Sequence, residues 1–152
     1  SALKEQLHTD LITAMKARDA LRTSTLRMAL AAITNAEVAG KEARELTDED
    51  VVTVLSSEAK KRRESAEAFA AGDRQELADK EKAEAEILAD YLPAQLTADE
   101  IRVIVTAAVE SAGAAGEGMK AMGKVMGIVS PQVKGKADGG AVAAEVKSQL
   151  GA

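Results

Sequence analysis

Cysteine and tryptophan are absent from this chain of 152 residues. One phenylalanine, Phe69, and one tyrosine, Tyr91, are present. The lack of cysteine excludes a disulfide framework, a thiolate nucleophile and cysteine-ligated zinc, and it fits a reducing compartment. The core must therefore be built from Ala, Leu, Ile, Val and Met. Stacking of bases on aromatic side chains, the usual means by which proteins bind single-stranded nucleic acid, is nearly excluded.

Long apolar runs are also absent. No stretch reaches the length that spans a membrane, and the start of the chain carries Lys4, Glu5, His8 and Asp10 where a secretion signal would be apolar. We therefore expect a soluble, cytoplasmic protein with no membrane contact.

Residues that would perform chemistry by themselves are missing. His8 is the only histidine, and neither a second histidine nor an acid placed for a catalytic triad accompanies it. Ser24 and Thr25 fall inside a predicted helix without a base. We predict no catalytic residue, no metal site and no cofactor, since such sites need several groups in one place.

Charged residues make up 30% of the chain, alanine is abundant, and apolar residues recur at helical spacing. The chain is therefore predicted to be all-α, with four helices in residues 1–92 and a small three-helix bundle in residues 93–152. The boundary falls at Tyr91-Leu92-Pro93, because a proline disfavours a helical residue before it.

Local signals predict where several helices begin and end. Asp19 is a candidate N-cap, and capping boxes are expected at Thr47-Asp48-Glu49-Asp50 and Thr97-Ala98-Asp99-Glu100. Gly40 is expected to cap the second helix at its C-terminus. The sixth helix is predicted over residues 119–129, stopping before Pro131.

The net charge of −5 argues against a general polyanion binder. Its distribution is uneven, because residues 1–92 hold 14 Lys and Arg against 19 Asp and Glu, whereas residues 93–152 hold 6 against 6. The second part is therefore freer to bind an anion.

The strongest candidate for an anion site lies before the seventh predicted helix. Lys134 and Lys136 flank Gly135 there, and a helix N-terminus beside lysines suits phosphate. Asp138 offers the alternative that it caps this N-terminus itself. The predicted nucleic-acid-binding residues are Lys120, Lys124, Lys134, Lys136 and Lys147.

Two further basic groups are secondary candidates. The run Lys60-Lys61-Arg62-Arg63 points nearly all round its helix, and pairing with Glu64 and Glu67 is the structural alternative. The other group lies at and after the first helix junction, where Arg22 can instead pair with Asp19; its candidates are Arg18, Arg22 and Arg27.

The stretch around residue 120 contains two further patterns, one of glycines and one of apolar residues. Gly118 to Lys124 matches the first seven positions of a phosphate-binding loop, but Val125 follows where Ser or Thr is needed, and no strand precedes it.

An apolar helical face lies in the same stretch and is either a core face or an adaptable groove for a partner. Its members are Met119, Met122, Val125, Met126 and Val129.

Several long segments resemble the YqeY proteins of bacteria. They are residues 21–33, which begin Leu21-Arg22-Thr23-Ser24-Thr25-Leu26-Arg27-Met28, followed by Asn35-Ala36-Glu37, then Glu58-Ala59-Lys60-Lys61-Arg62-Arg63-Glu64-Ser65, and Tyr91-Leu92-Pro93. The stretch Gly123–Gly140 is also similar to the tail of GatB, the tRNA-binding subunit of the glutamine-dependent aspartyl/glutamyl-tRNA amidotransferase. The first resemblance covers essentially the whole chain, and the second covers roughly residues 95–150.

The resemblance implies an accessory protein that binds tRNA and is linked to tRNA-dependent amidation. Its family label is carbon-nitrogen ligase activity with glutamine as amido-N-donor, which belongs to a complex, and the chain is not expected to be catalytic alone. Expected partners are tRNA and an aminoacyl-tRNA synthetase or amidotransferase complex, and no DNA is expected. Lys124, Lys134, Lys136 and Asp138 match the tail motif. The alternative is a helical protein-protein interaction module with no RNA role.

Overall fold

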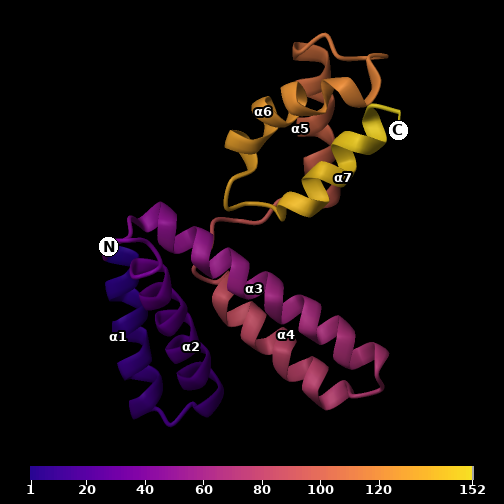
Figure 1. Ribbon diagram of the computed structural model, residues 1–152. Coiled ribbons are helices and arrows are strands. Elements are labelled where there is room, and N and C mark those ends of the chain that lie inside the picture. Colours follow the sequence, from indigo (N-terminus) through magenta and orange to yellow (C-terminus); the bar gives the residue numbers. More distant parts are fainter. Residues whose placement is uncertain (152) are drawn as a thin grey trace. The chain divides into compact units, whose positions relative to one another are not determined.

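The computed structural model describes residues 1–151 of the chain (Figure 1). Over that range it contains seven α-helices, one short 3-10 helix and no strand, so the prediction of an all-α protein is confirmed. The chain divides into two compact units, Ser1–Pro93 (unit 1) and Ala94–Ala152 (unit 2). None of the helices within residues 1–151 combines the length and the apolar character needed to cross a bilayer.

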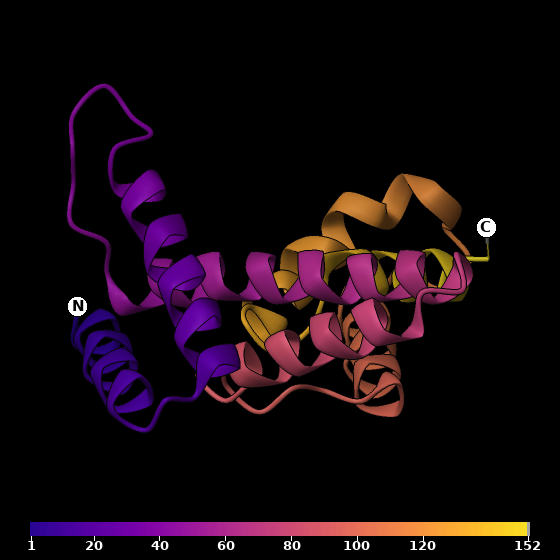
Figure 2. The same cartoon turned by 90° about the horizontal axis from the view of Figure 1, so that it is seen from below.

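Unit 1 consists of two helical hairpins. The first pairs α1 (Ala2–Lys16) with α2 (Ala20–Glu37), and the second pairs α3 (Asp48–Ala71) with α4 (Gln75–Ala89). Figures 1 and 2 both show α3 and α4 lying side by side along their lengths. Apolar residues at helical spacing meet between the hairpins, and the fully buried larger side chains there are Leu7, Leu26, Ile33, Val51, Leu55 and Leu88.

The predicted N-terminal caps of unit 1 are confirmed. The Asp19 side chain accepts a hydrogen bond from the backbone N–H of Arg22 at 3.0 Å. Thr47 and Asp50 form the reciprocal capping box of α3. Each bond satisfies an N–H group that the first helical turn leaves without a partner.

The predicted cap at Gly40 is wrong. Helix α2 ends at Glu37 with Val38 as its C-cap, and an extended loop leads to α3 (Figure 2). The backbone N–H of Arg44 returns to the Glu37 carbonyl at 2.9 Å. The loop therefore satisfies this end of the helix, and no left-handed glycine is required.

Helices α1 and α3 both end in a Schellman motif. At the end of α1 the N–H of Asp19 bonds to the Ala14 carbonyl and the N–H of Arg18 to the Met15 carbonyl, at 3.0 and 3.1 Å. Arg18 adopts φ 56°, and Asp73 takes the same place after α3 with φ 61°. This position normally favours glycine, because other residues meet steric strain there.

Unit 2 contains α5 (Ala98–Ser111), the 3-10 helix η1 (Gly118–Ala121), α6 (Met122–Val133) and α7 (Gly139–Gln149). The capping box predicted at Thr97 and Glu100 is confirmed. The core of this unit is built mainly from valine and alanine, and its fully buried members include Val105, Val125, Val129, Val142 and Val146.

The predicted extent of the sixth helix is wrong at both ends. Residues 118–121 form the 3-10 helix, and α6 continues through Pro131 to Val133. Pro131 lies inside α6, two residues before its end, where it removes the hydrogen bond that its N–H would have made and its ring crowds the carbonyl four residues earlier. Continuing the helix carries Val133 into the core, where it is 5% exposed.

Candidate nucleic-acid interface

The connection between α6 and α7 is a type II β-turn centred on Lys134 and Gly135. Lys134 has φ −56° and ψ 123°, Gly135 has φ 75°, and the N–H of Lys136 bonds to the Val133 carbonyl at 2.8 Å. The second central position of this turn needs a positive φ, which only glycine adopts without strain. The glycine between the two lysines is thus explained by the geometry of the turn.

The segment before α5 holds this turn in place. The N–H of Leu96 donates to the Lys136 carbonyl at 2.8 Å, and the Gln95 side-chain amide donates to the Gly135 carbonyl at 3.0 Å. Both lysine side chains are exposed. The backbone is therefore fixed while the two ammonium groups face solvent.

Asp138 occupies the N-cap position of α7, as the sequence suggested. Its backbone carbonyl accepts from Val142 at 3.1 Å, but its side chain makes no capping hydrogen bond to the first turn. Helix α7 begins with Gly139 and Gly140, so the helix N-terminus beside Lys134 and Lys136 carries no bulky side chain.

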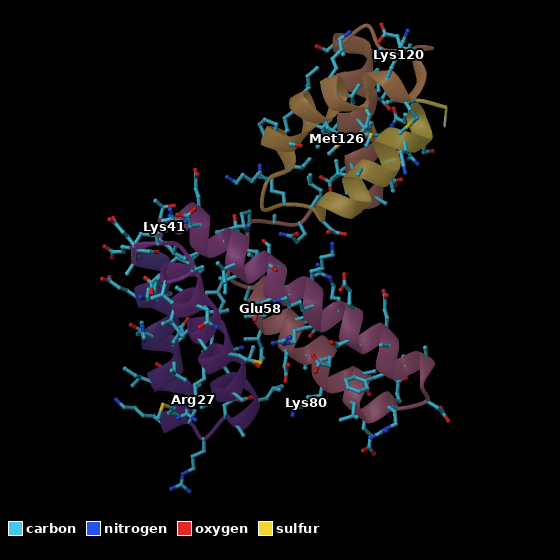
Figure 3. All side chains as sticks on the ribbon, in the orientation of Figure 1. Arg27, Lys41, Glu58, Lys80, Lys120 and Met126 are labelled. Carbon is cyan, nitrogen blue, oxygen red and sulfur yellow. The ribbon has the colours of Figure 1, made fainter. Side chains whose placement is uncertain are left out.

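The other three candidate lysines lie away from the turn. Lys124 is in the first turn of α6 and Lys147 is in the last turn of α7, and Figure 3 places Lys120 at the end of unit 2 opposite the turn. Lys124 and Lys134 are separated by about 15 Å along the helix at 1.5 Å per residue. Lys124 also pairs with Glu117 at 3.9 Å. The structure therefore divides the five candidates into two groups.

Within unit 2, negative and positive charges lie on different helices. Residues 94–117 hold one arginine and four carboxylates, a net charge of −3, whereas residues 118–151 hold five lysines and two carboxylates, a net charge of +3. The neutral total of the unit thus conceals an acidic α5 and a basic α6–α7 pair.

An apolar groove of 570 Å³ lies between α6 and α7, next to the turn. Val125 and Val129 face the core of unit 2, and Met122 and Met126 are half-buried. Met119 is 40% exposed on the 3-10 helix. The predicted apolar face is thus mainly a core face, and only its edge opens to solvent; the groove is lined by Met126, Gly127, Pro131, Val133, Ala137 and Val142, with Ser130, Lys134 and Gly139 also contributing.

The phosphate-loop reading has no structural support in the described residues. Gly118 to Lys124 forms the 3-10 helix and the start of α6, and residues 1–151 contain no strand to precede it. Within the same range no group of three or more His, Cys, Asp or Glu residues is placed to hold a metal ion.

The basic run of α3 is largely occupied by ion pairs. Lys60 lies 4.0 Å from Glu64 and Lys61 lies 3.2 Å from Glu58, and Arg63 is exposed. Pairing with Glu64 was expected from the spacing, whereas the Glu58 partner lies on the other side of the run.

Arg62 instead points into the interface of α3 and α4. Its guanidinium lies 3.8 Å from Glu58, 3.9 Å from Glu81 and 3.4 Å from Glu84, and 2.9 Å from the sulfur of Met28. Its Nε and the Oε2 of Glu81 are buried without a hydrogen-bond partner. Figure 3 shows Glu58 midway along α3. We call Arg62, Glu58, Glu81 and Glu84 the Arg62 cluster.

Glu84 is the most buried member of the Arg62 cluster, at 6% exposed. Burial raises the pKa of its carboxyl, and the negative charge of Glu81 raises it further, while Arg62 and Lys80 oppose the shift. The upward direction therefore comes first from burial and second from the neighbouring carboxylate of Glu81.

Sequence reasoning missed the Arg62 cluster, although a signal existed. Two of its four charged residues, Arg62 and Glu81, occupy positions of apolar helical repeats. These repeats are Leu55, Ala59, Arg62 and Ala66 on α3, and Ala78, Glu81, Ala85 and Leu88 on α4. A charge within an apolar stripe indicates burial with a partner from the facing helix.

The arginines of the first helix junction differ in accessibility. Arg18 and Arg27 are exposed, whereas Arg22 is half-buried and lies 3.9 Å from Asp19. Near Arg22, the hydroxyl of Tyr91 donates a hydrogen bond to Asp10. Burial and this bond raise the pKa of Tyr91 well above its usual range. Tyr91 therefore fastens the end of α4 to α1.

Comparison with known proteins identifies the family. The model of the Yqey-like protein family matches residues 4–150, so the chain belongs to this family. An uncharacterized protein of Schizosaccharomyces pombe, C22F3.15, is 35% identical over 92 residues, which cover 60% of this chain and 72% of that protein.

A second relative matches over nearly the full chain. The mitochondrial protein called altered inheritance of mitochondria protein 41, from Pyrenophora tritici-repentis, is 29% identical over 150 residues, covering 97% of this chain and 80% of that protein. Both relatives are fungal, and neither name describes a reaction or an RNA.

Proposed function

We propose that this Yqey-like protein is a non-catalytic accessory factor that binds tRNA through the basic α6–α7 side of unit 2 and supports tRNA-dependent amidation. The observation that carries the proposal is the exposed pair Lys134 and Lys136 on a turn fixed by backbone hydrogen bonds. Two exposed lysines on a fixed backbone suit neighbouring phosphates, because the backbone of the turn does not have to be ordered on binding.

Binding of this kind reads phosphate and shape. Lysine acts as a compact point charge, and the chain has almost no aromatic residues on which bases could stack. We therefore expect weak sequence selectivity and an affinity that falls steeply as salt rises.

The test is binding of bulk tRNA to the full chain and to a Lys134→Glu/Lys136→Glu variant over a range of salt concentrations. We expect the variant to bind about tenfold or more weakly at low salt and to show a salt slope smaller by about 1–2, because each lysine that no longer neutralises a phosphate lowers the slope by about one unit. A Lys41→Glu/Lys82→Glu variant carries the same change of charge on two exposed lysines of unit 1 and is the matched control. Equal weakening in both variants would show that only total charge matters.

Amide transfer is expected only in a complex. The purified chain with glutamine and aminoacylated tRNA should form no amide, and addition of an amidotransferase should reveal any accessory effect. Transfer by the chain alone would contradict the proposal.

We also propose a cytoplasmic location. Since one relative is named as mitochondrial, fractionation of the source cells decides between the two compartments.

A second candidate function is protein binding without an RNA role, and the groove between α6 and α7 favours it. Its lining combines an adaptable methionine with glycines whose surroundings are open. A Gly127→Leu variant fills this groove. Loss of a protein partner in that variant, with tRNA binding absent from the unaltered chain, would favour this second function over the first.

A further inference from the structure

Charge in unit 1 is separated as strongly as in unit 2. Residues 11–36 carry Lys16, Arg18, Arg22 and Arg27 against the single acid Asp19, a net charge of +3. The remaining residues of 1–93 hold ten bases and 18 acids, a net charge of −8. The turn end of the α1–α2 hairpin is thus a basic region on an otherwise acidic unit.

The same region exposes apolar side chains. Ile12 is 53% exposed and Met15 is 48% exposed, and residues three apart share one face of a helix. The Arg27 guanidinium from α2 lies 3.8 Å from the Met15 sulfur, and Figure 3 shows Arg27 near the turn end of the hairpin. Side chains of both helices therefore form one surface, which we call the hairpin surface: Ile12, Met15, Lys16, Arg18 and Arg27.

Arg18 is placed there against the preference of the backbone. Its left-handed conformation at the end of α1 favours glycine. The corresponding residue after α3 is Asp73, whose short polar side chain tolerates this conformation better than arginine does. Folding of the hairpin does not call for an arginine at position 18, and strain of this kind persists where a side chain has another role.

We propose that the hairpin surface is a docking site for a short, acidic, amphipathic segment of a partner protein. Carboxylates of that segment pair with Lys16, Arg18 and Arg27, and its apolar side chains cover Ile12 and Met15. Arginine and methionine are enriched at protein interfaces, and opposite charge around an apolar centre steers the two surfaces together.

The surrounding charge selects a small ligand. Screening limits the attraction of exposed charges to about 8 Å at physiological salt, so a segment bound over the turn end of the hairpin is attracted mainly by the basic side chains beneath it. A membrane surface or an extended RNA also meets the acidic remainder of unit 1. Phosphates gain nothing from Ile12 and Met15, whereas an amphipathic protein segment buries them. The site is independent of the tRNA proposal, which concerns unit 2.

The probe is a synthetic helical peptide of about 16 residues with glutamate on one face and leucine at i, i+3 and i+4, titrated into the full chain and followed by amide NMR. We expect signals of the hairpin surface to shift. An Arg18→Gly variant should bind about tenfold more weakly while its melting temperature stays equal or rises. The matched control is Asp73→Gly, which relieves the equivalent position after α3 and should leave peptide binding unchanged.

Three outcomes overturn the proposal. One is that a peptide with glutamine in place of glutamate binds equally well, or that neither peptide shifts these signals. Another is unchanged binding by Arg18→Gly. The third is that bulk tRNA or phosphatidylglycerol vesicles shift the same signals more strongly than the acidic peptide, which assigns the surface to phosphate. Each result is separate from the Lys134→Glu/Lys136→Glu experiment, so the two proposals fail independently.

Discussion

The basic run of α3 in unit 1 and the scattered lysines of unit 2 differ in how they are paired and exposed. In unit 1 the densest basic run, residues 60–63, lies on α3, whose partner α4 is rich in glutamate. Arg62 of this run is half-buried among the carboxylates of Glu58, Glu81 and Glu84. In unit 2 the lysines are scattered along the chain, yet the five between residues 118 and 151 are all exposed. Density of charge in the sequence is therefore a poor guide to charge that a ligand can reach.

The largest expected effect comes from removing the buried cation. Arg62→Met keeps the apolar volume but removes the guanidinium beside Glu81 and Glu84, while Glu58 keeps its ion pair with Lys61. We expect a loss of about 2–4 kcal/mol in the free energy of unfolding near neutral pH, since an uncompensated buried charge is costly. Urea denaturation measures it. Arg63→Met, at the exposed neighbour, should change stability by less than about 0.5 kcal/mol; similar losses in both would remove the contrast between buried and exposed bases.

The next effect compares two glycines of unit 2. Gly135→Ala places a side chain in the left-handed position of the type II turn and should destabilise unit 2 by about 1–2 kcal/mol. Gly127→Ala, inside α6 with open space around its Cβ position, should instead stabilise it by about 0.5–1 kcal/mol. Thermal unfolding followed by NMR signals of α7 measures both. Equal effects would mean that the turn does not constrain Gly135.

A smaller effect concerns Glu84. Because its pKa is raised in the folded state, folding favours the protonated form, and the stabilisation by that proton appears as pH falls from neutral toward the ordinary glutamate range of about 4.3. A Glu84→Gln variant lacks this proton uptake. We expect it to be more stable than the unaltered chain near pH 7, with the difference shrinking as pH falls toward the ordinary glutamate range.

The measurement is urea denaturation of both proteins across this range. Acids whose pKa is lowered, such as Asp50 in the capping box, lose stabilisation as pH falls, but they do so equally in both proteins. Taking the difference therefore isolates Glu84. A difference that grows toward low pH would reverse the sign and contradict the account of the Arg62 cluster.

Helix starts were predictable because their signals are local. Asp19, Thr47 with Asp50, and Thr97 with Glu100 each bond within three residues. Two of the errors, the cap at Gly40 and the stop before Pro131, came from applying equally local rules where a contact outside the helix decided. Arg44 completed the end of α2, and the core position of Val133 extended α6.

The lysines of the candidate interface were identified from the sequence, but their arrangement was not. The spacing of Lys134, Gly135 and Lys136 indicated a basic turn, whereas the attachment of that turn to Gln95 and Leu96 joins positions 40 residues apart. Separation of the five lysines into two groups likewise depends on which end of α6 or α7 each one occupies.

The sequence by itself determined the all-helical class, the N-terminal caps of α2, α3 and α5, and the family, because these depend on periodicity, on bonds within one helical turn and on ungapped motifs. Only the tertiary structure decided which charges are buried, where α2 and α6 end, and that Arg18 and Met15 join Arg27 in one surface. Those outcomes depend on pairing between helices, and the free energy of burying a side chain is set by the neighbours that the fold supplies.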